Sequence, residues 1–218
     1  SAATGKQPDV KAWPVKYVTM FHMTNDSSLF HKAEELEKRG WTRAPLNRWV
    51  KDGAQSVPLY EGKMVQMFDH RAADVVVNAE NLHRAAQPET ISQVEKASPN
   101  RYPQPQFFVE ASETSANPYD WALGYKEISA PTNARSMIAT MLPAVAFGNK
   151  VPLLIPQVET PHVAARTSTL IAANFNCFAF DFVLRQKLQG QTINLFILEQ
   201  LPVIAPKRFH DPLPAAFA

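Results

Sequence analysis

The sequence predicts an α+β fold, in which a mixed sheet has flanking helices and a long helix lies near the C-terminal end. Segments patterned as strands and as helices are mixed without the regular spacing of βαβ units, which disfavours a doubly wound parallel sheet. The 218 residues are 45% hydrophobic and 19% charged, so the chain can bury a core. There are 18 prolines against 7 glycines, and we expect the prolines to mark the borders of short elements.

Seven segments have the composition of strands. Each is short and rich in β-branched or aromatic residues, and turn residues or prolines stand near most of their ends. The longest of them is expected to be interrupted at Gly62. In chain order the expected strands are 15–21, 48–51, 57–70, 107–110, 121–128, 137–141 and 151–155.

Four segments, 29–39, 72–86, 91–97 and 164–188, are patterned as helices. The first has N-cap candidates at 25–28, and Gly40 stands where a C-terminal cap belongs. The last is the strongest, because its apolar residues repeat at intervals of four, three and four. Its expected apolar face comprises Ile171, Phe175, Phe178 and Phe182, and the polar stripe beside it comprises Asn174, Asp181 and Arg185.

Several classes of function lack their motifs in this chain. It contains no glycine loop of the kind that binds nucleotides or S-adenosylmethionine, and its six histidines show no zinc-binding spacing. A single cysteine, Cys177, excludes a disulfide framework. The longest apolar runs are too short to span a bilayer, so we expect no membrane partner and a cytoplasmic location. The Ser-Ala-Ala opening without a methionine indicates a piece of a longer protein.

Two short motifs suggest chemistry. The sequence Glu61-Gly62-Lys63 has the E-x-K form of a metal-dependent nuclease half-site, for which Asp9 would be the second carboxylate. Asn117 opens an N-P-Y sequence similar to the N-P-P-Y loop of amino-methyltransferases, but a turn before a strand explains it better. We therefore predict no catalytic residue and no metal ligand in this chain, and keep the nuclease as an alternative.

Basic residues are the remaining candidates for function. The net charge is only +2, so a nucleic-acid surface would have to arise from local clustering of lysines and arginines. Basic side chains near strand ends, turns or a helix C-terminus can reach phosphates. Those in such places are Lys63, Arg71, Lys126, Arg135, Lys150, Arg185 and Lys187.

Four blocks of sequence, taken in order, carry a resemblance to a known family. The most specific is 58–71, which reads P-L-Y-E-G-K-M-V-Q-M-F-D-H-R. The others lie within 29–41, 121–143 and 173–202. Together they resemble the C-terminal target-recognition region of type IIG restriction–modification proteins and related N6-adenine DNA methyltransferases. The resemblance covers roughly residues 28–204.

The resemblance implies a target-recognition-domain-like fold that reads double-stranded DNA as part of a phage-defence system. A methyltransferase domain of the same polypeptide would bind S-adenosylmethionine, so no cofactor is expected in this chain. The expected boundaries are an N-terminal linker at 1–14, the recognition domain at 15–206 and a tail at 207–218. We expect DNA contacts from Lys63, His70, Arg71, Arg135, Arg185 and Lys187. The alternatives are a nuclease at Glu61 and Lys63, and a helix at 164–188 that docks the methyltransferase domain.

Overall fold

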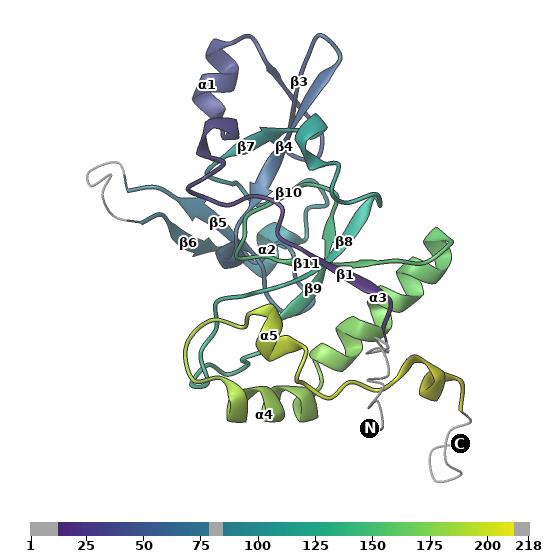
Figure 1. Cartoon of the computed structure of the whole chain (residues 1–218). Coiled ribbons are helices and arrows are strands. Elements are labelled where there is room, and N and C mark those ends of the chain that lie inside the picture. The colour runs from purple at the N-terminus through teal and green to yellow at the C-terminus, as the bar shows by residue number, and fades with distance from the viewer. Residues whose placement is uncertain (1–12, 79–84, 212–218) are drawn as a thin grey trace, which may run out of the picture.

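Two sheets and a layer of helices form the body of the protein. The structure is a computed structural model that describes residues 13–78 and 85–211. The α+β class is confirmed, with several antiparallel sheets and with the C-terminal helices gathered on one side (Figure 1). The strands are β1 Val15–Val18, β2 Thr42–Ala44, β3 Arg48–Lys51, β4 Ala54–Tyr60, β5 Ala73–Val76, β6 Gln87–Thr90, β7 Phe108–Glu110, β8 Trp121–Tyr125, β9 Ala139–Pro143, β10 Ala146–Phe147 and β11 Leu153–Pro156. The α-helices are α1 Ala33–Lys38, α2 Gln93–Lys96, α3 Pro161–Phe175, α4 Phe178–Lys187 and α5 Leu195–Leu198.

The sheet β1-β11-β8-β9 is antiparallel throughout and is covered on both faces. Alternate residues of its strands point to opposite sides, as the pleat requires. Leu153 and Ile155 of β11 join a core shared with β4 of the second sheet. Leu154 between them joins a different core, with Phe175 and Leu184 of the C-terminal helices. This sheet is therefore the middle layer between the second sheet and the helices.

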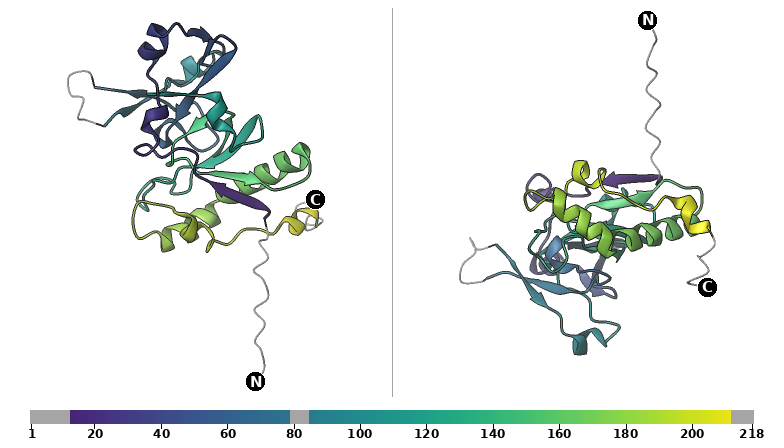
Figure 2. Two further views of the ribbon diagram at one scale, coloured as in Figure 1. Left: turned by 45° about the horizontal axis from the view of Figure 1, so that its top comes forward. Right: turned by 90° about the horizontal axis from the view of Figure 1, so that it is seen from below.

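The second sheet has the order β10-β4-β3-β2, and β7 also pairs with β4. Its one parallel pair, β10 with β4, places Phe147 beside Tyr60. Helix α1 lies at the end of the molecule that this second sheet forms, away from α3, α4 and α5 (Figure 1). The hairpin β5–β6 projects to the side of the body, as the further views also show (Figure 2).

The expected helix at 72–86 is wrong where the structure describes it. Residues 73–76 form β5, which pairs with β6 in antiparallel register, while 79–84 lie outside the described residues. The alanines favour a helix locally, but Val75 is buried and its N–H bonds to the carbonyl of Gln104. The Asp74 carboxylate accepts hydrogen bonds from the side chain of Arg101 and the N–H of Gln104. These tertiary contacts override the local propensity.

The expected long helix at 164–188 is two helices, α3 and α4, bent by 64° at the break. Asn176 ends α3, and its side-chain amide pairs with the N–H and the carbonyl of Ala139 at the edge of β9. Cys177 caps α4 through its sulfur, which accepts the N–H of Phe180. The predicted apolar face is divided as a result: Ile171 and Phe175 are buried, whereas Phe178 is 82% exposed and Phe182 is 65% exposed.

Smaller differences concern element ends. The expected strand 57–70 ends at Tyr60, and a 3₁₀ turn follows at Gly62–Met64. The expected helix 29–39 begins only at Ala33, after a separate 3₁₀ turn at Ser27–Leu29, and Gly40 has the positive φ of +80° predicted for its cap. The expected strand 48–51 is present with the predicted ends, and the other expected strands and the helix at 91–97 are present with shifted ends.

Both ends of the described chain meet beside the helices. Trp13 packs edge-on against Phe209 at 6.1 Å between ring centroids and donates its indole N–H to the carbonyl of Ile204. The remaining residues of the expected linker, 1–12, and of the expected tail, 212–218, lie outside the described residues. No single helix in the described ranges has the length and apolarity to cross a membrane, and α3 with α4 reaches both only as a bent pair.

Candidate nucleic-acid interface

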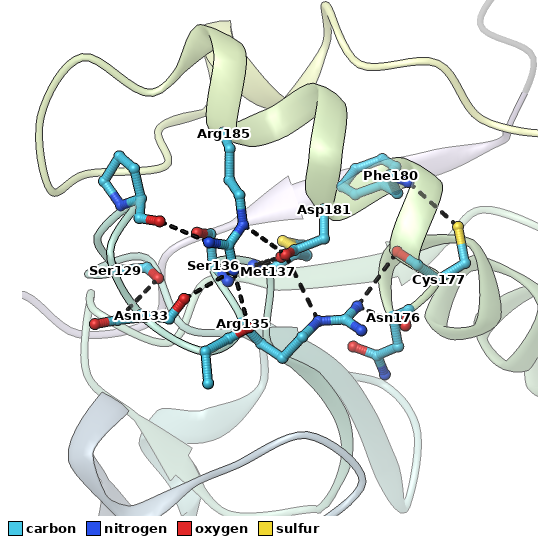
Figure 3. A network of polar contacts seen from close by, with 12 residues as sticks. Ser129, Asn133, Arg135, Ser136, Met137, Asn176, Cys177, Phe180, Asp181 and Arg185 are labelled. Carbon is cyan, nitrogen blue, oxygen red and sulfur yellow. Dashed lines mark hydrogen bonds and ion pairs between the residues drawn. The ribbon is translucent and has the colours of Figure 1, made fainter.

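Two of the predicted DNA contacts, Arg135 and Arg185, meet at the carboxylate of Asp181 (Figure 3). Asp181 lies on α4 and is 4% exposed. One of its oxygens accepts the backbone N–H groups of Ser136 and Met137 at 2.8 and 2.7 Å. The other accepts Nε of Arg185 at 2.9 Å. Burial alone would raise the pKa of Asp181, but these donors outweigh it and hold the pKa below its usual range.

Further donors of these arginines are also used internally, although Nε of Arg135 is buried without a hydrogen-bond partner in the described residues. Arg185 binds the carbonyls of Pro131, Asn133 and Ala134 at 2.6–2.9 Å. Arg135 binds the carbonyls of residues 176 and 177, and its guanidinium lies 4.6 Å from the ring centroid of Phe178. Together with Asp181 these contacts fasten the loop 129–137 to α4, so both arginines have a structural role in this geometry.

Arg71 is bound internally in a similar way. Its guanidinium donates to the carbonyls of Lys96, Ser98 and Arg101 at 3.1–3.3 Å. Lys96 is the last residue of α2, where carbonyls lack intrahelical partners. Arg71 therefore ties the end of α2 to the segment that follows β4.

Three lysines line one cleft of about 410 Å³. Lys63 comes from the turn after β4, Lys126 from the end of β8 and Lys150 from the turn between β10 and β11. The other lining residues are Met23, Glu61, Gly62, Ile128 and Gly148. Backbone bonds hold these strand ends together, since Gly148 donates to Tyr60 at 2.9 Å and Glu127 donates to Lys150 at 3.1 Å.

Close packing of the backbone shapes this lysine cleft. A Cβ atom on Gly62 would lie 3.0 Å from the carbonyl oxygen of Lys150, so only glycine fits there without a shift. Two of the three ammonium groups have acidic partners: Lys63 is 3.0 Å from Glu61, and Lys150 is 2.7 Å from Glu127. The lysine cleft thus carries one more positive than negative charge among these five groups.

Lys126 supplies the uncompensated charge. Its side chain is half-buried, and within the described residues no acceptor pairs with its ammonium group. Burial lowers the pKa of Lys126, with no opposing ion pair. A half-buried cation that lines a cleft without a counter-charge is a group that an anion would stabilise.

His70 and Lys187 complete the predicted set, and the structure does not bring them to the lysine cleft's lining. His70 is half-buried, and its Nδ1 is buried without a hydrogen-bond partner in the described residues. Burial and the neighbouring Arg71 lower the pKa of His70. Lys187 is exposed at the end of α4 and donates to Gln200 on the loop after α5 at 3.3 Å.

Sequence reasoning placed Lys126 and Lys150 among the basic residues near strand ends but did not select them. The useful signal was present: Lys126 directly follows a buried strand, and Lys150 stands three residues before the start of another. These two lysines differ from the predicted arginines in the number of acceptors within the protein to which each side chain hydrogen-bonds. That number depends on tertiary contacts.

The two short motifs have local explanations in the fold. Asn117 bonds through its side chain to the carbonyls of Tyr119 and Trp121, so the N-P-Y sequence forms the predicted turn before β8. Glu61 and Lys63 pair with each other in the lysine cleft, and the suggested partner Asp9 lies outside the described residues. In the part of the chain that the structure describes, no cluster of three metal-ligating His, Cys, Asp or Glu side chains occurs.

No family model matches this chain, and neither a curated protein nor a solved structure is found to be similar.

Proposed function

We propose that this chain is a sequence-specific DNA recognition module of an adenine-specific DNA methyltransferase of the type IIG restriction–modification kind. The observation that carries the proposal is Lys126, a half-buried ammonium that has no counter-ion in residues 13–78 and 85–211 and lies in a cleft that two further lysines line. DNA presents a row of phosphates, and neutralising them releases bound counter-ions and supplies most of the non-specific affinity. Lys63 and Lys150 would exchange their carboxylate partners in part for phosphate oxygens.

The arginines take a supporting role in this proposal. Arg135 and Arg185 hold the loop 129–137, which follows directly on the segment that carries Lys126. Base reading would then come from groups around the lysine cleft rather than from these arginines. S-adenosylmethionine would bind to the methyltransferase domain of the same polypeptide, and the module would act in the cytoplasm.

The salt dependence of DNA binding tests the proposal. The logarithm of the binding constant falls linearly with the logarithm of the salt concentration, and each phosphate contact to B-DNA makes this slope steeper by about 0.9. Lys126→Met should therefore make the slope shallower by about 1. Lys38→Met on α1 is the matched control: this lysine also has no ion-pair partner in the described part of the chain but lies outside the lysine cleft, and its loss should leave the slope unchanged. The probe is a pool of short duplexes randomised in sequence. Absence of binding by the full chain, or equal slopes for both variants, would contradict the proposal.

A second function is favoured by the exposed face of α4. Phe178 and Phe182 lie one helical turn apart and are 82% and 65% exposed. Large exposed aromatic side chains are typical of surfaces that contact another protein. This face would dock the methyltransferase domain of the same polypeptide. The paired change Phe178→Ser and Phe182→Ser should abolish binding to the separately produced methyltransferase domain while DNA binding by this chain persists.

A further inference from the structure

Phe68 combines two features that a folding role does not explain. Its side chain is 70% exposed, and it belongs to none of the hydrophobic clusters of the described residues. Its backbone is left-handed, with φ of +59°. That conformation suits glycine or asparagine, and it is strained for a bulky side chain. The backbone strain at Phe68 thus accompanies an aromatic ring that is exposed to solvent.

The turn that carries Phe68 is held firmly. Gln66 and Asp69 exchange both backbone hydrogen bonds, at 2.8 and 2.9 Å, so that residues 67 and 68 form a two-residue turn. The Asp69 carboxylate accepts Nζ of Lys96 at 2.6 Å and the N–H of Arg71 at 2.8 Å. Because the backbone is fixed in this way, a ligand that contacts the ring would lose little conformational entropy.

Phe68 lies close to the lysine cleft. Its N–H points to the carbonyl of Ala139 at 3.5 Å, and Ala139 is the register partner of Tyr125, the residue before Lys126. Two steps of the usual strand spacing, or roughly 10 Å, separate the backbones of Phe68 and Tyr125, and Lys126 is the next residue along that strand. That is the span of a few nucleotides of one strand, which rises about 3.4 Å per nucleotide.

We propose that Phe68 is a base-stacking residue, which inserts its ring against an unstacked base or a base step of DNA whose phosphates lie in the lysine cleft. The inference rests on the proposed DNA-binding function. Aromatic rings stack on bases of any sequence, and apolar wedges of this kind open base steps in bent duplexes. The strained turn is then the means by which the ring is directed away from the protein surface.

Four variants of the full chain test this role against the randomised duplex pool. Phe68→Ala should weaken binding about tenfold, the size of a lost base stack, with an unchanged salt slope because no charge is removed. Phe68→Trp should retain the affinity. Phe68→Gly should bind as weakly as Phe68→Ala yet raise the melting temperature by about 2–4 °C, because it relieves the left-handed strain. Phe196→Ala is the matched control, since Phe196 is 73% exposed on α5, and it should bind as the unaltered chain does.

Permanganate oxidation of thymines gives the second readout, since unstacked thymines react faster. The unaltered chain should increase this reactivity in bound DNA, and Phe68→Ala should remove the increase. DNA binding that is equal in the unaltered chain and Phe68→Ala, with a normal salt slope, would overturn the role of Phe68 while leaving the proposed function intact. Weaker binding without any thymine reactivity would also overturn stacking. A chain that binds no DNA would overturn both proposals.

Discussion

Asp181 is predicted to be a position outside the hydrophobic cores at which one substitution strongly destabilises the fold. Asp181→Asn keeps the size of the side chain and removes its charge. Three charge-assisted hydrogen bonds, from Ser136, Met137 and Arg185, then become neutral or are lost. Charged acceptors contribute about 1 kcal/mol more per bond than neutral ones, which gives a loss of about 3 kcal/mol in the free energy of unfolding.

The pH dependence of this loss follows from the depressed pKa of Asp181. A carboxylate whose pKa is lower in the folded state stabilises the fold above its unfolded value of 3.8, and that stabilisation disappears as pH falls through the folded value. The difference between the unaltered chain and Asp181→Asn should therefore be full at neutral pH and should shrink in strong acid.

Urea unfolding followed by tryptophan fluorescence, repeated across the acidic range, measures both effects. Asp52→Asn is the control: Asp52 is exposed in a turn at φ of +48°, which asparagine adopts equally well, so its stability should be unchanged. A loss below about 1 kcal/mol, the range of an exposed ion pair, would refute the structural role of the Asp181 network. A loss that stays constant into strong acid would refute the assignment to the charge.

Three further outcomes are expected. Lys126→Met should be more stable than the unaltered chain at neutral pH. Because burial lowers the pKa of Lys126 below 10.5, the unaltered chain should gain stability as pH rises through that lowered value. Denaturant unfolding at several pH values measures this rise, and the same rise in the Lys126→Met variant would contradict its assignment to Lys126. Gly62→Ala should cost about 1–3 kcal/mol in urea unfolding and weaken DNA binding, since its Cβ would press on the carbonyl of Lys150; an unchanged midpoint would contradict the close packing. Arg71→Ala should cost about 1–3 kcal/mol through three lost hydrogen bonds while the salt slope of DNA binding stays the same, and a lower slope would assign Arg71 to the DNA instead.

Secondary structure was predictable where local pattern and tertiary pairing agree. The strand at 107–110 and the helix at 91–97 carry their own signals, and Ser92 and Glu95 form a reciprocal cap that is legible in the sequence. The prediction failed at β5, where an alanine-rich segment pairs with β6. Propensity is a weak prior that pairing and burial overrule.

The break between α3 and α4 was not predictable from periodicity. The four-three-four spacing of apolar residues continues through the break, so the pattern predicts one helix. The deciding contact is the side-chain amide of Asn176, which bonds to Ala139, 37 residues earlier in the chain. The bend places Phe178 and Phe182 in solvent, although their spacing marks them as core residues.

The candidate site was predictable only as a class of residues. Arg185 and Lys126 have the same formal charge and similar places beside elements of secondary structure. Arg185 finds three carbonyls 51–54 residues earlier in the chain, whereas Lys126 finds no acceptor among the described residues. The tertiary structure therefore decides which cationic side chain stabilises the fold and which can bind a ligand.

The two groups of basic residues depend on each other. The Asp181 network fixes the backbone of Ser136 and Met137, and the next residue, Ile138, accepts the N–H of Lys126 through its carbonyl at 2.9 Å. A displaced loop would therefore shift the residue on which the proposed DNA contact depends. An arginine that never touches a phosphate can thus be as necessary for binding as a lysine that does. The salt slope distinguishes the two roles, since it counts the charges that meet the DNA and not the contacts that position them.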